Sequence, residues 1–250
     1  MTRILVLGLL AVAAGTRAQP QERVGPPNWR FVGAEAGRPG VVVRNAPFSA
    51  DVTTETSMAL QDGNHIRQTS TLRLYRDGEG RTRREQSLNN VGGLASNTNL
   101  PPVVFINDPV AHVNYALSPS SRTATRSIGG GRGGRMMRGA VAGGVQQNVR
   151  TESLGSKTLE GVATEGTRTT VTIPAGQMGN EQPLQTVVES WYSPDLQVIV
   201  FSKRSDPRTG ETVTRYTNIN RTEPAHSLFE VPADYKIGAA PARGLKNGAK

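Results

Sequence analysis

A long alternation of apolar and polar residues between Phe48 and Leu60 constrains the fold of this chain more than any other feature. Apolar residues and threonines recur at every second position, and serine, threonine or acidic residues fill the positions between them. A period of two turns one face of a strand toward apolar material and the other toward water. The turn residues Asp62-Gly63-Asn64 follow, and a second β-rich run extends from His65 to Arg76. The two runs predict a long β-hairpin.

Further extended runs, separated by short polar turns, fill most of the remaining chain. They are expected at Val41–Val43, Arg81–Ser87, Val103–Ile106, Ala111–Leu117, Val149–Leu154, Gly161–Ile173, Leu184–Tyr192, Leu196–Lys203, Glu211–Ile219 and Phe229–Pro232. No segment has the period of an amphipathic helix. Consecutive hairpins of this kind predict an all-β fold, with one large curved antiparallel sheet arranged as a meander or half-barrel and little helix. A first strand of about 43 Å must twist and coil, which favours a curved sheet over a compact sandwich.

The first 18 residues have the layout of a signal peptide. Arg3 precedes the apolar stretch Ile4–Ala14, which is too short to span a bilayer, and Thr16-Arg17-Ala18 offers small residues for cleavage. A buried apolar strand or an uncleaved anchor is the alternative. The pattern predicts a periplasmic or secreted protein that is soluble after signal removal.

The remaining chain divides by composition. Residues 19–46 are rich in Pro, Gly and Arg and are expected to form an irregular leader. Residues 47–237 are expected to form a single β-sheet domain, with a disordered Gly/Arg-rich loop at 128–144. Residues 238–250 are expected to be a disordered tail.

Positive charge is concentrated in one segment. The whole chain has a formal charge of +9, yet six arginines and no acidic residue lie between Asp108 and Glu152. Glycine and arginine alternate irregularly at its centre, so Arg132, Arg135 and Arg138 are candidate contacts for an anionic envelope component. A solvated insertion between two strands is the alternative. Nucleic acid is not an expected partner, because the chain carries an export signal and no aromatic residue interrupts the tract.

Residue types that carry chemistry are sparse. The chain has no cysteine, which excludes thiol catalysis, thiolate metal sites and disulfides. Its three histidines, His65, His112 and His226, are far apart and share no motif. No nucleophile elbow, zinc-protease or calcium-loop motif occurs. We therefore expect no catalytic residues, no metal site and no cofactor, and a protein that is not an enzyme.

One strand is apolar on both faces. Leu196–Phe201 has apolar residues at nearly every position, so it needs cover on both sides or it lines an apolar cavity. Ordinary core packing and ligand lining are both open for it. If the sheet binds an apolar ligand, the candidate ligand-binding residues are Val52, Met58, Leu72, Trp191 and Val198.

The stretch from Thr158 to Ile237 resembles the C-terminal half of the LolA/LolB/RseB-like superfamily. The resemblance is carried by Gly161–Gly166 before a threonine-rich strand, by Glu189–Leu196, and by the closing segment Ser227–Tyr235. The hairpins at Asp51–Glu85 and the segment Phe105–Leu117 are compatible with the N-terminal half. The resemblance implies an exported half-barrel whose concave side holds lipid or acylated protein.

The carriers of that superfamily have helices that plug the open side, and no comparable helix is readable here. The Gly/Arg segment is also foreign to the common pattern, so no functional residue is carried over from the resemblance. The expected function is an exported, non-catalytic binding protein that holds a lipid or acyl chain on the concave face of its sheet. The alternative is an envelope protein–protein interaction or sensor module that uses the basic Gly/Arg loop.

Overall fold

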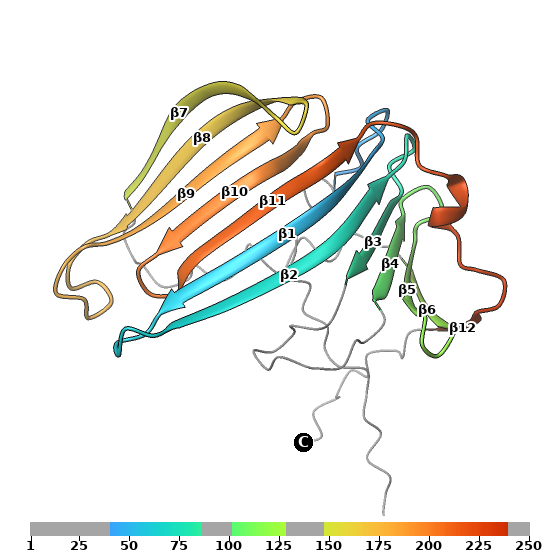
Figure 1. Cartoon of the computed structure of the whole chain (residues 1–250), viewed down its shortest axis with the longest axis horizontal. Coiled ribbons are helices and arrows are strands. Elements are labelled where there is room, and N and C mark those ends of the chain that lie inside the picture. Colours follow the sequence, from blue (N-terminus) through green and yellow to red (C-terminus); the bar gives the residue numbers. More distant parts are fainter. Residues whose placement is uncertain (1–40, 87–101, 129–147, 240–250) are drawn as a thin grey trace, which may run out of the picture. The chain divides into compact units, whose positions relative to one another are not determined.

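The computed structural model describes residues 41–86, 102–128 and 148–239, which belong to one unit of the chain, residues 33–250. The described part is almost entirely β-strand, as the alternation predicts (Figure 1). The strands are β1 (Phe48–Ala59), β2 (His65–Arg76), β3 (Thr82–Gln86), β4 (Val103–Asp108), β5 (Val113–Ser118), β6 (Thr123–Ile128), β7 (Asn148–Leu159), β8 (Val162–Ile173), β9 (Leu184–Ser193), β10 (Val198–Asp206), β11 (Gly210–Asn220) and β12 (Lys236–Ala239). The only helix within the described residues is the 3₁₀ turn η2 (His226–Phe229).

All twelve strands form one sheet, in the order β12-β6-β5-β4-β3-β2-β1-β11-β10-β9-β8-β7. Two meanders of neighbouring hairpins, β1 to β6 and β7 to β11, meet where β1 pairs with β11 (Figure 1). Every pairing is antiparallel except that between β12 and β6. The predicted curved antiparallel sheet with little helix is confirmed.

The first hairpin has the expected register. Phe48 lies opposite Arg76 and Ala59 opposite His65, without interruption. The turn is closed by Asp62, whose side chain accepts a hydrogen bond from the backbone N–H of Asn64 at 2.9 Å. Gly63 has a φ of +82°, a region in which side chains are disfavoured. Turn chemistry and alternation therefore act together to fix which residues of β1 and β2 share a face.

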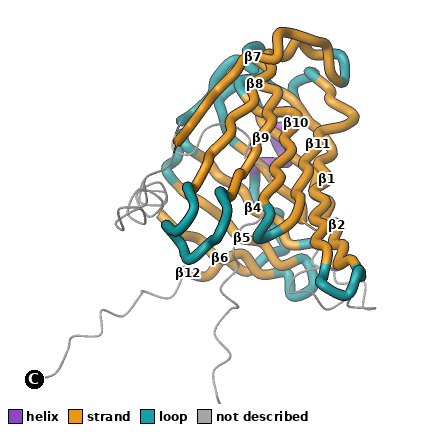
Figure 2. The backbone as a smooth tube through the Cα atoms, turned by 90° about the vertical axis from the view of Figure 1, so that its left-hand side faces the viewer, coloured by secondary structure: helices purple, strands orange, loops and turns teal. Residues whose placement is uncertain are grey.

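The sheet bends around one of its faces (Figure 2). Arg76 on β2 donates a hydrogen bond to the carbonyl oxygen of Leu196, in the turn between β9 and β10. In a flat sheet β2 and β10 would lie three strand spacings apart, about 14 Å, which is further than an arginine side chain reaches. We therefore call the face that carries Arg76, Phe48 and Val52 the inner face, and the opposite face the outer face.

Local irregularities accompany this curvature. The register shifts between Ser49 and Asp51 of β1, between Ile199 and Phe201 of β10, and between Ser153 and Gly155 of β7. Bulges of this kind add twist to the strand that carries them.

A hydrophobic core fills one end of the inner face. Its buried residues are Phe48, Ala50, Val52, Leu72, Leu74, Val162, Leu196, Val198, Val200 and Tyr216. Along β1 the burial stops after Val52, because Thr54, Thr56 and Met58 on the same face are only half-buried. The core therefore occupies part of the inner face and leaves the remainder accessible.

Arg76 lies within this core. Arg76 is 1% exposed, and its guanidinium carbon lies 4.7 Å from the centre of the Phe48 ring. The guanidinium also donates a hydrogen bond to the carbonyl oxygen of Ala46 at 2.7 Å. Burial lowers the pKa of Arg76 to about 10. The side chain thus connects β2, the segment before β1 and the β9–β10 turn at one point.

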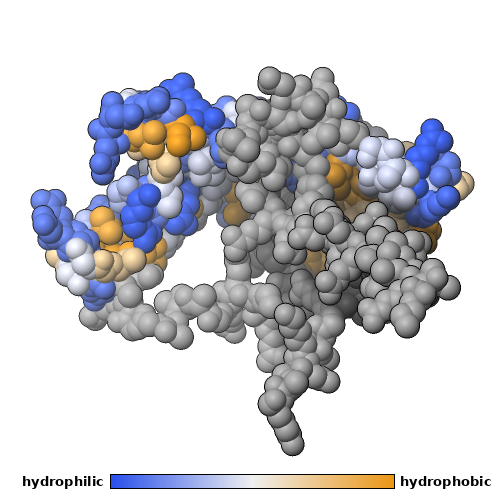
Figure 3. Space-filling view, turned by 90° about the horizontal axis from the view of Figure 1, so that it is seen from below, coloured by the Kyte–Doolittle hydropathy of each residue, from blue (hydrophilic) through white to orange (hydrophobic). Residues whose placement is uncertain are grey.

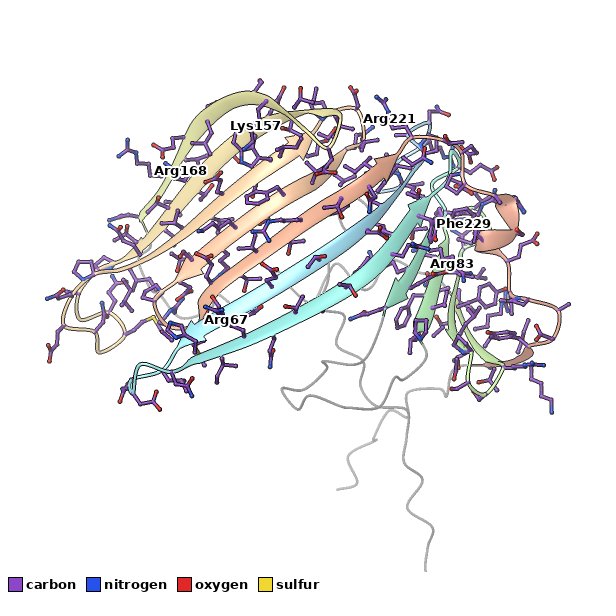
Figure 4. The ribbon with its side chains drawn as sticks, viewed as in Figure 1. Arg67, Arg83, Lys157, Arg168, Arg221 and Phe229 are labelled. Atoms are coloured by element: carbon purple, nitrogen blue, oxygen red, sulfur yellow. The ribbon has the colours of Figure 1, made fainter. Side chains whose placement is uncertain are left out.

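A second core lies on the outer face of β4 to β6. Val104, Ile106, Leu117 and Ala124 are buried there beneath Phe229 of η2. Arg83 of β3 donates to the carbonyl of Leu228 at 2.9 Å, and Figure 4 labels Arg83 and Phe229 beside each other. The segment after β11 therefore crosses the outer face of the first meander before β12 pairs with β6.

Several boundaries differ from the sequence-based expectations. Strand β6 lies outside the expected strands, because Ala124 is its only buried residue and the apolar period is missing. Strand β12 is exposed throughout and is defined by pairing alone, so it extends two residues past the expected start of the tail. Phe229 ends a 3₁₀ turn instead of beginning an extended piece, and Val41–Val43 forms no strand.

Residues 1–40, 87–101, 129–147 and 240–250 lie outside the described residues, and with them the expected signal peptide, most of the leader, most of the tail and the Gly/Arg-rich loop except Ile128, which ends β6. None of the helices among the described residues has the length and hydropathy needed to cross a membrane.

Candidate functional site

A row of hydroxyl side chains crosses the accessible part of the inner face. Directly paired residues of seven neighbouring strands, β2-β1-β11-β10-β9-β8-β7, are all serine or threonine. The members of this hydroxyl row, in that order, are Ser70, Thr54, Thr214, Ser202, Ser190, Thr167 and Ser153. Paired residues of neighbouring strands point to the same face, so the seven side chains share the inner face.

The hydroxyl row is accessible and only partly hydrogen-bonded. None of its seven residues is buried. The Oγ1 atoms of Thr54 and Thr214 lie 3.1 Å apart and share one hydrogen bond. The hydroxyls of Ser70, Ser190 and Ser202 make no hydrogen bond within the part of the chain that the structure describes. Half-buried hydroxyls of this kind are satisfied by water or by a ligand.

A second row, two residues further along each strand, repeats part of this pattern. Thr56 and Thr212 pair across β1 and β11 with their hydroxyls 3.4 Å apart, and Thr151 and Thr169 pair across β7 and β8 at 3.2 Å. The repeat comes from Thr-x-Thr or Thr-x-Ser in four strands. That pattern is visible in the sequence, but only the register shows that the four copies align.

Apolar side chains lie beyond the hydroxyl row on the same face. Met58 and Ile66 are paired across the first hairpin, and Val188 lies opposite Thr169. Met58 and Val188 are half-buried, while Ile66 is 44% exposed. Exposed apolar residues that gather on one face are typical of binding surfaces. In the view from below, apolar patches (orange) are bordered by hydrophilic residues (blue) (Figure 3).

A buried carboxylate fixes the end of β10. Asp206 accepts hydrogen bonds from Arg208 Nε at 2.9 Å, from Arg204 Nη2 at 3.0 Å and from Thr186 Oγ1 at 3.0 Å. Hydrogen bonds from Arg208 above all hold the pKa of the Asp206 carboxyl well below its usual range. The cluster places one carboxylate between two arginines at this end of the inner face and joins β9, β10 and the turn that follows.

The five candidate ligand-binding residues are separated by the structure. Val52, Leu72 and Val198 lie in the core, with exposed fractions of 1%, 8% and 2%, so they contact protein. Met58 is half-buried on the accessible part of the inner face. Trp191 pairs with Phe201, which pairs with Arg215, a neighbour of Thr53. That register places Trp191 on the outer face, opposite from Val52.

Trp191 forms a small packed cluster on the outer face. Lys157 Nζ lies 3.6 Å from the ring centre, and the indole N–H donates to Glu189 at 2.8 Å. A Cβ atom at Gly166 would lie 2.7 Å from the ring, so the ring rests on a position that only glycine accommodates. Apolar alternation in the sequence could not reveal this, because charged residues supply the cover.

Charges alternate across the outer face. Paired positions on β10, β9, β8 and β7 are Lys203, Glu189, Arg168 and Glu152. Arg168 lies 3.1 Å from Glu152 and 3.6 Å from Glu189. Figure 4 labels Arg168 and Lys157 on these strands. The outer face is thus a solvated face of compensated charges, in contrast to the uncharged hydroxyl row.

Catalytic and metal-binding clusters are not found in the described segments. No group of three histidine, aspartate or glutamate side chains there could hold a metal ion. His65 and His112 are exposed, and His226 is 61% exposed beside Glu230. The anionic-contact candidates Arg132, Arg135 and Arg138 lie outside the described residues.

Comparison with known proteins gives a likeness of fold. No protein-family model matches the chain, and no curated protein matches it. An uncharacterized conserved protein from Thermus thermophilus is similar at 11% identity, over 78% of this chain and 91% of that one, with a TM-score of 0.41. MucB, solved in the MucA/MucB complex of Pseudomonas aeruginosa, is similar at 11% identity over 79% of this chain, with a TM-score of 0.40. This chain spans 59% of that MucB chain.

A LolA superfamily protein from Nitrosomonas europaea is similar at 10% identity, over 80% of this chain and 98% of that one, with a TM-score of 0.33. The solved structures thus include a member of the superfamily that the sequence resembles. At these identities and TM-scores the likeness is one of fold alone.

Proposed function

We propose that the protein is an exported, non-catalytic binding protein that holds an amphipathic ligand with an acyl chain on the inner face of its sheet. One observation carries the proposal: the core fills only one end of that face, and the half-buried Met58 and Val188 and the exposed Ile66 add apolar surface to the remainder, beside the hydroxyl rows. Met58, Ile66 and Val188 would contact the acyl chain there. The layout of residues 1–18 supports export to the periplasm or beyond.

The paired threonines are compatible with an apolar chain. Where two threonine hydroxyls bond to each other across strands, as in Thr56–Thr212 beyond the hydroxyl row, part of their hydrogen-bonding demand is met within the sheet. A methylene chain laid over such pairs therefore leaves fewer polar groups unsatisfied than one laid over isolated hydroxyls.

Uptake of a fluorescent fatty acid by protein purified without detergent tests this function. We expect binding by the native protein and at least about tenfold weaker binding by Met58→Glu, because a charge on the inner face must be desolvated by the acyl chain. Ala59→Glu is the matched control, since Ala59 is the exposed neighbour on the outer face. Native mass spectrometry supplies a second readout. No uptake and no bound lipid in the native protein would refute the proposal.

A second candidate is an envelope interaction module. The segment between Asp108 and Glu152 carries six arginines and no acidic residue, which favours an acidic partner in the envelope, whether a membrane surface or a protein. This function needs no ligand on the inner face, so the acyl-uptake experiment separates the two proposals.

A further inference from the structure

The hydroxyl row has a property that the proposed function does not require. An acyl chain needs only apolar contact, yet seven aligned side chains on the inner face present hydroxyl groups. We infer that the hydroxyl row recognises the polar part of the ligand, and that this part is a neutral polyhydroxyl group such as a sugar or polyol. The inference rests on the proposed function and names the ligand class for the same face.

Unused hydrogen-bonding capacity is the first argument. A hydroxyl group offers one donor and two acceptor lone pairs. The bond between Thr54 and Thr214 uses a single donor, and the hydroxyls of Ser70, Ser190 and Ser202 are unengaged within the described part of the chain. The row therefore offers both donors and acceptors, which is what another set of hydroxyl groups requires.

Absence of charge from the row is the second argument. The seven residues carry none, whereas the outer face of β7 to β10 alternates Lys203, Glu189, Arg168 and Glu152. The nearest inner-face cation, Arg204, lies opposite Thr212, two residues beyond the row, and is held at 3.0 Å by Asp206, which also binds Arg208. An ionised ligand group on the row would lose hydration without meeting an opposite charge among the side chains of the row itself. A neutral group does not incur this cost.

Position is the third argument. Thr54, Thr214 and Ser202 are consecutive members of the row on adjacent strands, which are about 4.8 Å apart. The row borders the filled core on one side, where Val52 and Leu72 are buried, and on the other side the pair Thr56–Gln68 separates it from Met58 and Ile66. A ligand with its polar group on the row can therefore extend its acyl chain over Met58 and Ile66.

The test uses the full secreted chain and three probes: dodecyl maltoside below its micelle concentration, dodecanol and free maltose. The row variant is Thr54→Val/Thr214→Val/Ser202→Ala, which removes hydroxyls with little change in shape. The control is Thr53→Val/Thr71→Val, a paired set on the outer face of β1 and β2. Ser202→Ala alone serves if the triple variant does not fold by circular dichroism. Affinities are measured by titration calorimetry.

We expect the row variant to bind dodecyl maltoside about tenfold more weakly and dodecanol unchanged, with the control equal to the native protein. If free maltose binds the native protein and not the row variant, the polar group that the row recognises comes from a free polyol. If the native protein binds dodecyl maltoside and dodecanol with equal affinity, and the row variant binds both as the native protein does, this inference is overturned. The proposed function is then left intact. Failure of every probe to bind overturns both.

Discussion

Arg76 on β2 donates hydrogen bonds to the backbone carbonyls of both Ala46 and Leu196, which are 150 residues apart in the chain. The contact joins the segment before β1 to the β9–β10 turn through one buried side chain. It is the clearest sign that the sheet curls around its inner face, because a flat sheet would keep these groups apart.

Arg76→Met should loosen this junction. Two buried carbonyls lose their donor, while the cost of burying a cation disappears, so we expect the free energy of unfolding to fall by about 2 kcal/mol. Amide exchange in residues 193–197 should accelerate. Arg73→Met is the control, because its ion pair with Asp51 is on the outer face and 60% exposed on the arginine side. Equal effects of the two substitutions would contradict the role given to Arg76.

Asp206 should make the protein sensitive to acid. Its carboxyl pKa is lowered in the folded state, so its contribution to stability is complete above the unfolded pKa of about 3.9 and is lost as the pH falls below it. Asp206→Asn should lower the free energy of unfolding by about 2 kcal/mol at pH 7. Between about pH 5 and pH 2 the variant should then lose less stability than the native protein. Urea denaturation at several pH values measures both. Asp195→Asn, an exposed partner of Arg221, should change neither.

Gly166→Ala should displace Trp191. The added methyl group would lie 2.7 Å from the indole and 2.9 Å from the Cβ of Leu154. We expect the free energy of unfolding to fall by about 1–3 kcal/mol. We also expect a change in tryptophan emission, measured in a Trp29→Phe background that leaves Trp191 as the single tryptophan. Gly155 pairs with Gly166 but has no atoms near its missing side chain. An unchanged emission spectrum in Gly166→Ala would show that the ring does not rest on this residue.

The Gly/Arg segment gives a prediction that depends on charge alone. Vesicles containing an anionic lipid should bind the native protein at low salt and release it at high salt, because screening acts within about 8 Å at physiological ionic strength. Arg132→Gln/Arg135→Gln/Arg138→Gln should bind more weakly at low salt. Arg67→Gln/Arg73→Gln on the outer face of β2 serves as the control. Binding that survives in the segment variant would locate the contact elsewhere.

Alternation and turn residues were enough to predict the first hairpin and the class of sheet. Phe48, Val52 and the turn at Gly63 each carry local signals that agree with the final register. Strand β12 carries no such signal, since its exposed residues are ordered by hydrogen bonds to a strand more than 100 residues earlier. A local sequence pattern cannot predict a strand that is defined only by its pairing with a distant strand.

The candidate site was harder to predict for a related reason. Val52 and Trp191 both alternate with polar neighbours, but β-pairing across four strands places them on opposite faces. The Thr-x-Thr repeats are plain in the sequence, and their alignment depends on register between strands that are not neighbours in the chain. A ligand surface made of such rows is therefore a property of the assembled sheet.

The pairing of β1 with β11 has a consequence for how the molecule forms. β1 begins at Phe48 and β11 ends at Asn220, so the β1–β11 pairing that joins the two meanders can form only after most of the polypeptide has been synthesised. Each half can form its own hairpins early, but long loop closure must precede this pairing. We expect formation of the β1–β11 pairing to limit the rate of folding. Until it is complete, the edge strands of the two meanders can pair incorrectly.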